Sequence, residues 1–243
     1  MSVTRTLLLT GASRGIGHAT VRKFNDEGWR VITCSRHPFP DACPWSGGED
    51  NHVQIDLASP NDVIEKVEVI RERLGGRLDA LVNNAGISPK SEDGARLDTL
   101  TTDLRTWGHV FHVNFFASVV LARSLRAELA KAQGAVVNVT SIAGSRVHPF
   151  AGAAYATSKA ALAALTREMA HDFGPMGVRV NAIAPGEIRT DILSPGTEEL
   201  AETIPMRRLG EPQEVADTVY FLCTAPSAYI SGTEIEINGA QHV

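Results

Sequence analysis

Residues 6–17 read TLLLTGASRGIG, and this stretch says more about the architecture than any other in the chain of 243 residues. The apolar run Leu7–Leu9 is typical of a buried strand, and the apolar spacing after Gly17 is typical of a helix. Glycines at positions 11, 15 and 17 carry no Cβ atom, so a phosphate group can approach the backbone and the first N–H groups of the helix. The stretch therefore predicts a strand, a phosphate-binding turn and a helix. The alternative is an ordinary turn with unrelated glycines.

The rest of the chain alternates between strand and helix patterns. Strands are expected at 6–10, 30–34, 52–55, 78–82, 135–140, 178–183 and 233–237. Helices are expected at about 15–27, 60–74, 103–130, 154–173 and 211–224. This alternation predicts an α/β fold of the Rossmann type, a doubly wound, seven-stranded parallel sheet with helices on both faces. The chain shows no internal repeat and no linker composition, so residues 1–243 are expected to form a single domain.

The segment between the second and third strands departs from this pattern. Residues 37–51 read HPFPDACPWSGGEDN, and three prolines and two glycines exclude a regular helix. We expect an irregular crossover with Phe39 and Trp45 packed on the surface. The nearby Cys34, His37, Cys43 and His52 contain no tightly spaced ligand pair, so no metal site is expected.

Composition narrows the possible partners and compartments. Net charge is −5, which disfavours nucleic acid and anionic membrane surfaces as partners. No apolar run approaches the roughly 18 residues of a membrane span, and the first strand follows Met1 too closely for a signal peptide. The chain has three cysteines, an odd number without framework spacing, which favours reduced thiols. These features predict a cytoplasmic protein.

Residues 154–159 read AYATSK and place Tyr155 and Lys159 one helical turn apart on the same face. A free phenol has a pKa of about 10, and a nearby ammonium group favours the phenolate and brings that pKa closer to neutrality. Such a group can take a proton from an alcohol and return it to a ketone. The pair alone occurs easily by chance, so the interpretation depends on the motifs around it.

Those motifs together resemble the short-chain dehydrogenase/reductase family, in its single-domain type of about 250 residues. The order and spacing of the following residues fit the family: Thr10, Gly11, Gly15, Gly17, Asn83-Asn84-Ala85-Gly86, Asn114, Ser141, Tyr155, Lys159, Pro185-Gly186 and Thr190. The overall look is most similar to 3-oxoacyl-carrier-protein reductases, through residues 205–210 and 232–239. An acidic carrier protein needs a basic patch, and residues 127–133 and 173–177 supply one lysine between them, which weakens that substrate.

The resemblance implies a role for each catalytic candidate. Ser141 would bond the substrate oxygen, Tyr155 would exchange the proton, and Lys159 would lower the pKa of Tyr155 and bind the cofactor ribose. Asn114 would hold a water that links Lys159 to solvent. On the residues alone, Asn114 is equally well explained as a buried side chain with its hydrogen bonds satisfied.

The charge pattern after the second strand predicts the cofactor. NAD-binding folds place a carboxylate about 20 residues beyond the glycines, whereas this chain has Ser35-Arg36 there and a further Arg14 in the glycine loop. Two guanidinium groups suit the 2′-phosphate of NADP, and NAD is the alternative if both arginines are only solvated surface residues. The residues expected to bind the cofactor are Gly11, Ser13, Arg14, Gly15, Ile16, Gly17, Ser35, Arg36, Asp56, Leu57, Asn84, Ala85, Gly86, Thr140, Tyr155, Lys159, Pro185, Gly186, Ile188 and Thr190.

Three positions keep two interpretations each. Asp56 resembles an adenine-contacting residue but also suits the simple end of a strand. His148 could be a second acid–base group, although lining the substrate pocket or capping a turn is the favoured interpretation. Residues 191–205 are expected to form a turn and a short helix that act as a lid over the substrate.

These observations predict an NADP-dependent enzyme that reversibly reduces a small ketone or aldehyde. An NAD-dependent dehydrogenase of sugars or polyols is the alternative, and a dinucleotide-binding protein without activity is a third. The helices at 101–132 and 154–173 are apolar on more than one face, which predicts a symmetric dimer contact. By resemblance, a second contact through the C-terminal strand would complete a homotetramer. A helix enclosed within its own domain is the alternative.

Overall fold

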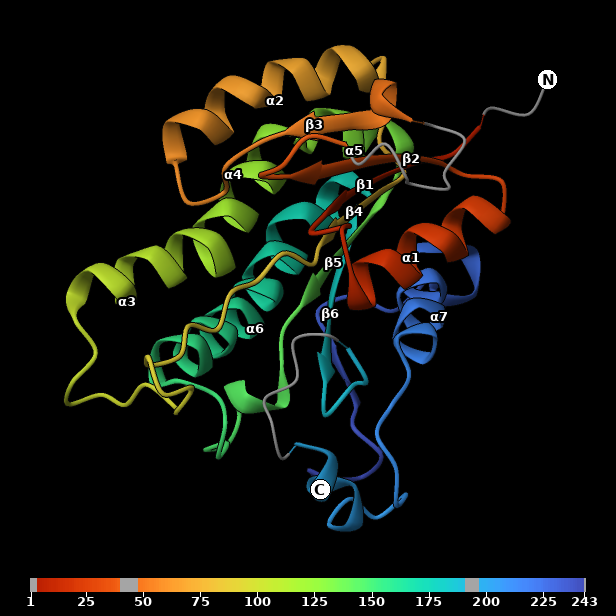
Figure 1. Ribbon diagram of the computed structural model, residues 1–243. Helices are drawn as coiled ribbons and strands as arrows, with labels where there is room; N and C mark the ends of the chain where they lie inside the picture. Colours follow the sequence, from red (N-terminus) through yellow and green to blue (C-terminus); the bar gives the residue numbers. More distant parts are fainter. Residues whose placement is uncertain (1–3, 40–47, 191–196, 243) are drawn as a thin grey trace.

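A single parallel sheet forms the centre of the computed structural model, which describes residues 4–39, 48–190 and 197–242 (Figure 1). Its seven strands follow the order β3-β2-β1-β4-β5-β6-β7, and every neighbouring pair is parallel. The strands are β1 (Thr6–Thr10), β2 (Arg30–Ser35), β3 (His52–Gln54), β4 (Ala80–Asn83), β5 (Ala135–Val139), β6 (Arg179–Pro185) and β7 (Glu234–Ile237). The predicted doubly wound fold is confirmed.

Helices cover both faces of the sheet because alternate residues of each buried strand point to opposite sides. On β1, Leu8 belongs to the core shared with α2, α4, α5 and α6, whereas Leu7 and Leu9 belong to the core shared with α1 and α7. Figure 1 shows α1 and α7 side by side on one face. The helices are α1 (Gly15–Asp26), α2 (Pro60–Leu74), α3 (Leu104–Phe111), α4 (Ala117–Ser124), α5 (Arg126–Ala132), α6 (Ala153–Phe173) and α7 (Pro212–Cys223). Across the described ranges, none of these helices has the length and apolar character of a membrane span.

The single helix predicted at 103–130 is wrong in detail. A π-helical turn, His112–Phe116, separates α3 from α4, and Leu125 with φ −99° and ψ 15° separates α4 from α5. The turn contains Asn114, whose side-chain amide bonds the backbone of Ile87 instead of facing solvent. A π-turn inserts one residue into a helix, and such insertions often accompany functional sites.

Two predicted irregular segments lie partly outside the described residues. Residues 40–47, with Cys43 and Trp45, belong to the predicted crossover, and the described parts on either side contain no α-helix, only a 3-10 turn at Glu49–Asn51. Residues 191–196 belong to the predicted lid, and the described remainder contains a 3-10 helix at Thr197–Glu202.

A chain of buried polar side chains links the centre of the sheet to α6. The Asn83 amide donates to Asn138 Oδ1 at 2.8 Å, and Asn138 Nδ2 donates to Thr166 Oγ1 at 2.9 Å. Thr166 in turn donates to the Leu162 carbonyl on its own helix. All three polar side chains are buried, so each bond replaces a bond to water that is no longer possible. The network fixes α6, and with it Tyr155 and Lys159, against β4 and β5.

We predict that Asn138→Ala lowers the free energy of unfolding by about 2–4 kcal/mol, because it leaves a cavity and removes the acceptor of the buried Asn83 amide. Urea unfolding followed by circular dichroism measures the change. The control is Asn61→Ala on the exposed surface of α2, which should stay within about 0.5 kcal/mol of the parent. Equal effects of the two substitutions would contradict a structural role for the network.

Candidate active site

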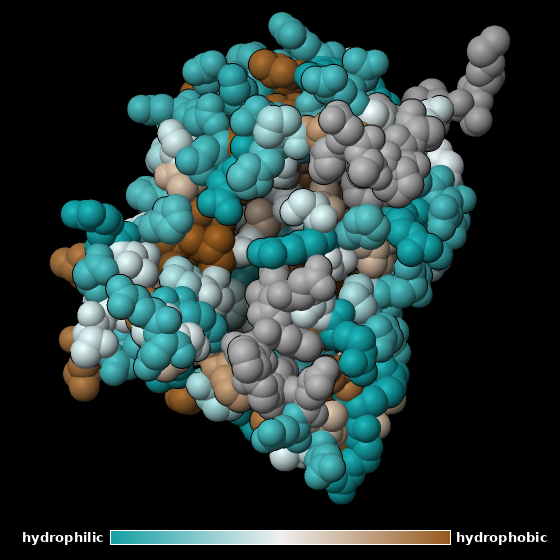
Figure 2. Space-filling view, in the orientation of Figure 1, coloured by the Kyte–Doolittle hydropathy of each residue, from teal (hydrophilic) through white to brown (hydrophobic). Residues whose placement is uncertain are grey.

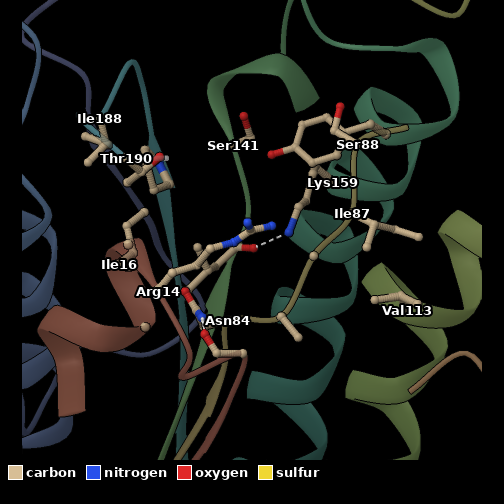
Figure 3. Close-up of a pocket in the computed structure, with 18 of the residues that line it drawn as sticks. Arg14, Ile16, Asn84, Ile87, Ser88, Val113, Ser141, Lys159, Ile188 and Thr190 are labelled. Atoms are coloured by element: carbon tan, nitrogen blue, oxygen red, sulfur yellow. Dashed lines mark hydrogen bonds between the residues drawn. The ribbon is translucent and has the colours of Figure 1, made fainter. Parts of the chain in front are cut away.

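A cavity of about 600 Å³ opens at the carboxyl ends of the strands, where the chain leaves β1 and β4 in opposite directions (Figure 3). This is where ligands bind in open parallel sheets. Every residue predicted to bind the cofactor lines this cavity, as do Ser141, Tyr155 and Lys159. Of the predicted site residues, Asn114 is the one that does not line the cavity.

The loop after β1 requires glycine at two positions because the neighbouring backbone lies too close for a side chain. A Cβ on Gly17 would lie 2.0 Å from the Gly11 carbonyl oxygen, and a Cβ on Gly11 would lie 2.8 Å from Ala85 Cα. Gly11 also has φ +73°, a conformation that side chains disfavour. Helix α1 begins at Gly15, and the residue before it, Arg14, makes no side-chain cap. The first N–H groups of α1 therefore suit an anionic group such as a pyrophosphate.

Asn84 holds the loop after β4 against the loop after β1. Its Nδ2 donates to the carbonyl oxygens of Thr10 and Gly11 at 3.0 and 2.9 Å. The Thr10 hydroxyl accepts from the N–H groups of Asn84 and Ala85, each at 3.1 Å. These four bonds fix the floor of the cavity at the point where the strand order changes direction, between β1 and β4.

One end of the cavity lies beside β2, where Arg36 directly follows the strand. Both Arg14 and Arg36 line the cavity with exposed side chains. The Gln54 amide donates to the Arg36 carbonyl at 2.9 Å, so the backbone at this position is held by β3. Asp56 lines the same end, and its Oδ1 accepts from the Ala58 N–H at 3.0 Å. This bond fits the second interpretation of Asp56, in which the residue only ends the strand.

The loop after β6 forms the opposite wall. A Cβ on Gly186 would lie 2.9 Å from Asn238 Cβ, so glycine is required where this loop meets the C-terminal segment. Ile188 is buried, and Thr190 lies close to Gly15, 3.0 Å from the position of a Cβ there. The Thr140 hydroxyl is used within the sheet, donating to the Ile183 carbonyl at 2.7 Å.

Ser141, Tyr155 and Lys159 meet between β5 and α6. Ser141 and Tyr155 line the cavity together, Ser141 lowers the pKa of Tyr155, and Lys159 Nζ lies 5.7 Å from the centre of the Tyr155 ring. Lys159 is buried and donates to the Val139 carbonyl at 2.7 Å, the bond drawn as a dashed line in Figure 3. Serine, phenol and ammonium groups thus share one wall of the cavity.

The expected lowering of the Tyr155 pKa is wrong for this structure. Burial of the phenol raises the pKa of Tyr155, and the negative charge of Glu187 raises it further, while the hydrogen bond from Ser141 acts in the opposite direction. Burial also lowers the pKa of Lys159, to about 8. The Lys159 ammonium, 5.7 Å from the centre of the Tyr155 ring, donates to the Val139 carbonyl, and burial has the larger effect on the Tyr155 pKa.

Both polar atoms of the Asn114 side chain form hydrogen bonds within the protein. Its Oδ1 accepts from the Ile87 N–H at 2.8 Å, and its Nδ2 donates to the Ile87 carbonyl and to Ser158 Oγ, at 3.1 and 3.0 Å. A Cβ on Gly86 would lie 3.6 Å from Asn114 Oδ1 and 3.2 Å from Lys159 Nζ, so the two side chains approach each other across this glycine. The geometry fits the satisfied buried asparagine that the sequence left open.

Two charged residues of the cavity had no predicted role. Lys90 and Glu187 line it together with His148, for which pocket lining was the favoured interpretation. His148 Nε2 lies 2.6 Å from Glu187 Oε1, and both side chains are nearly buried. Glu187 directly follows the Pro185-Gly186 motif, which was a usable signal, whereas no motif marked Lys90.

Comparison with known proteins agrees with this site. The profile of a family described as enoyl-(acyl carrier protein) reductase matches residues 11–242. Protein FixR of Bradyrhizobium diazoefficiens is 56% identical over 98% of this chain and 87% of its own. A 3-oxoacyl-[acyl-carrier-protein] reductase, FabG, of Vibrio cholerae is 32% identical over 98% of both chains. A crystal structure of a Brucella ovis oxidoreductase of the short-chain dehydrogenase/reductase family, in complex with a partially ordered NAD, is 57% identical with a TM-score of 0.85, covering 97% of this chain and 100% of that one.

The chain therefore belongs to the short-chain dehydrogenase/reductase family, the NAD(P)-dependent oxidoreductases that act on CH–OH groups. The resemblance inferred from the motifs is confirmed.

Proposed function

We propose that this protein reversibly reduces a small ketone or aldehyde with NADPH, and that Tyr155 supplies the proton. One observation carries the proposal: Ser141, Tyr155 and Lys159 line the same cavity as the glycine loop that suits a pyrophosphate. The bound dinucleotide supplies the hydride.

Ser141, Tyr155 and Lys159 each have a separate role in the proposed proton transfer. Ser141 donates a hydrogen bond to the carbonyl oxygen and orients it toward Tyr155. Tyr155 gives its proton to the same oxygen, and the raised pKa keeps the phenol protonated at neutral pH, as an acid in the reductive direction must be. Lys159, with a pKa of about 8, is largely charged at pH 7 and stabilises the phenolate left after transfer. The Lys159–Val139 bond fixes the position of that charge.

The preference for NADP rests on Arg14 and Arg36, two exposed arginines that line the cavity. Guanidinium groups bind phosphate oxygens through paired, charge-assisted hydrogen bonds. The NAD in the Brucella ovis structure supports the alternative, in which the arginines face solvent and the ribose carries no phosphate.

A reducing compartment fits the described cysteines. Cys34 and Cys223 are buried as free thiols, and burial raises the pKa of each to about 12, so both stay protonated and unreactive. This supports the proposal of a cytoplasmic enzyme.

Tyr155→Phe should lower kcat by about 100- to 10,000-fold, because only the proton donor is removed. The dissociation constant of the dinucleotide should change little. A panel of ketones, aldehydes and alcohols assayed with both cofactors measures the rate, and fluorescence titration measures binding. The matched control is Tyr229→Phe on the exposed surface, which should retain the parent rate. Activity of Tyr155→Phe within tenfold of the parent would refute the mechanism.

Arg36→Ala should weaken NADPH binding by about 10- to 150-fold, the value of one charge-assisted contact to a phosphate, and should weaken NADH binding far less. Arg14→Ala should act in the same sense. Arg22→Ala, which removes an exposed arginine of α1 outside the cavity, serves as the control. A parent enzyme that prefers NADH, or equal weakening of the two cofactors, would overturn the NADP assignment.

We also propose that the enzyme is a homotetramer or a homodimer. The aromatic rings of Trp107, Phe111, Phe115 and Phe116 form a continuous row on α3 and the π-turn, and Figure 2 shows an apolar patch beside α3. Phe116 is exposed in the single chain, and such patches usually lie in contacts between copies.

Light scattering at micromolar concentration should therefore give a mass of two or four times 26.1 kDa. A dimer would retain the helix contact and reject only the second contact through the C-terminal strand. A monomer would reject both contacts.

A further inference from the structure

The wall of the cavity near Tyr155 carries three charged or titratable side chains that the proton transfer does not use. Lys90 comes from the segment after β4, His148 from the loop after β5, and Glu187 from the loop after β6. Three separate segments thus contribute to one polar wall, and its composition indicates what kind of substrate fits there.

Lys90 is held in place and does not swing freely into solvent. Its Nζ donates to the carbonyl of Phe150, and its backbone forms an isolated antiparallel bridge with Arg96. Arg96 Nε donates to the Ala151 carbonyl at 2.7 Å, so the loop that carries Lys90 is attached to the loop that carries Phe150. A second attachment joins the same two loops through the Ala153 N–H and the Leu97 carbonyl, at 2.9 Å.

The charge of Lys90 lacks a matching anion. Within residues 4–39, 48–190 and 197–242, no carboxylate lies within ion-pair distance of Nζ. One of its three N–H groups bonds Phe150, which leaves two for a ligand. Burial lowers the pKa of Lys90, which means that the half-buried ammonium has lost part of its hydration. An anionic group on a bound ligand would compensate for that loss.

The carboxylate of Glu187 lies against His148 and forms no ion pair with Lys90 in the described part of the chain. The distance from Glu187 Oε1 to His148 Nε2 is 2.6 Å. His148 Nδ1 accepts from the Phe150 N–H at 3.3 Å, and its Nε2 faces the Glu187 carboxylate. At longer range, the negative charge of Glu187 raises the pKa of Lys90 and thereby favours its charged form. Glu187 thus opposes the effect of burial on the pKa of Lys90 without occupying its donors.

We propose that the substrate is a small oxo acid whose carbonyl oxygen lies at Ser141 and Tyr155 and whose carboxylate binds the ammonium group of Lys90. This inference rests on the proposed function and specifies its substrate class. The oxo acid gains a hydride at its carbonyl carbon and the Tyr155 proton at its oxygen, the dinucleotide is oxidised, and the carboxylate is unchanged. A neutral acyl chain would leave the ammonium group of Lys90 partly dehydrated and unpaired.

The first test observes Lys90 directly. The chain has five lysines, so ¹³Cε-labelled lysine gives five NMR signals, and the Lys90 signal is identified by its loss in Lys90→Met. Acetoacetate and 4-oxopentanoate are added to the enzyme with the oxidised form of the dinucleotide that binds more tightly, so no turnover occurs. The acids should shift the Lys90 signal at concentrations where their methyl esters do not.

The second test is kinetic. The parent should have a kcat/KM for the acids that exceeds that for the esters. Lys90→Met should lower this acid-to-ester ratio by about 10- to 150-fold, mainly through KM, and Lys90→Arg should restore part of it. The control is Lys131→Met, which removes the same charge from an exposed position outside the cavity and should leave the ratio unchanged.

The two tests separate this inference from the proposed function. A Lys90 signal that ignores every acid, or responds equally to the esters, overturns the carboxylate site even if neutral ketones are reduced through Tyr155. A ratio that Lys90→Met leaves intact overturns it as well. If Tyr155→Phe keeps full activity while the acids still shift the Lys90 signal, the proton-transfer mechanism fails and the carboxylate site stands.

Discussion

The close contact between the loops after β1 and β4 is the constraint on which the rest of the site depends. A Cβ on Gly11 would lie 2.8 Å from Ala85 Cα, and a Cβ on Gly17 would lie 2.7 Å from Asn84 Nδ2. The Asn84 amide joins the two loops by donating to the Thr10 and Gly11 carbonyls. The contact lies where the order of the strands reverses, so it fixes the floor of the cavity and turns the first N–H groups of α1 toward it. A larger residue at either glycine would move both loops.

Burial has opposite consequences for the two central groups of the site. It raises the pKa of Tyr155 and lowers the pKa of Lys159, which favours the neutral form of each. The protein thereby keeps a protonated phenol beside an ammonium group whose pKa is lowered. Such an arrangement suits proton donation to a developing alkoxide, where an already ionised phenolate would have nothing to give. Burial at Lys90 follows the same rule, and there the missing anion is assigned to the substrate.

Local patterns in the sequence were sufficient for the strands, for most helices and for the glycine loop, because a buried parallel strand needs a continuous apolar run and a close backbone approach needs glycine. The break in the predicted helix at 103–130 was not visible in that pattern. A π-turn leaves the apolar spacing almost unchanged, and Asn114 within it bonds the backbone of Ile87, 27 residues away in the chain. Contacts of that separation have no local signature.

The sequence by itself determined the family of this protein, because the order and spacing of Gly11, Ser141, Tyr155 and Lys159 match the motifs of the short-chain dehydrogenase/reductase family. Only the tertiary structure decided the electrostatics. Whether Lys159 acts on the phenol, and whether Lys90 and Glu187 face the same cavity as His148, depends on burial and on distances between loops that leave different strands. Those quantities follow from the packing of the whole sheet, and no short stretch of the chain contains them.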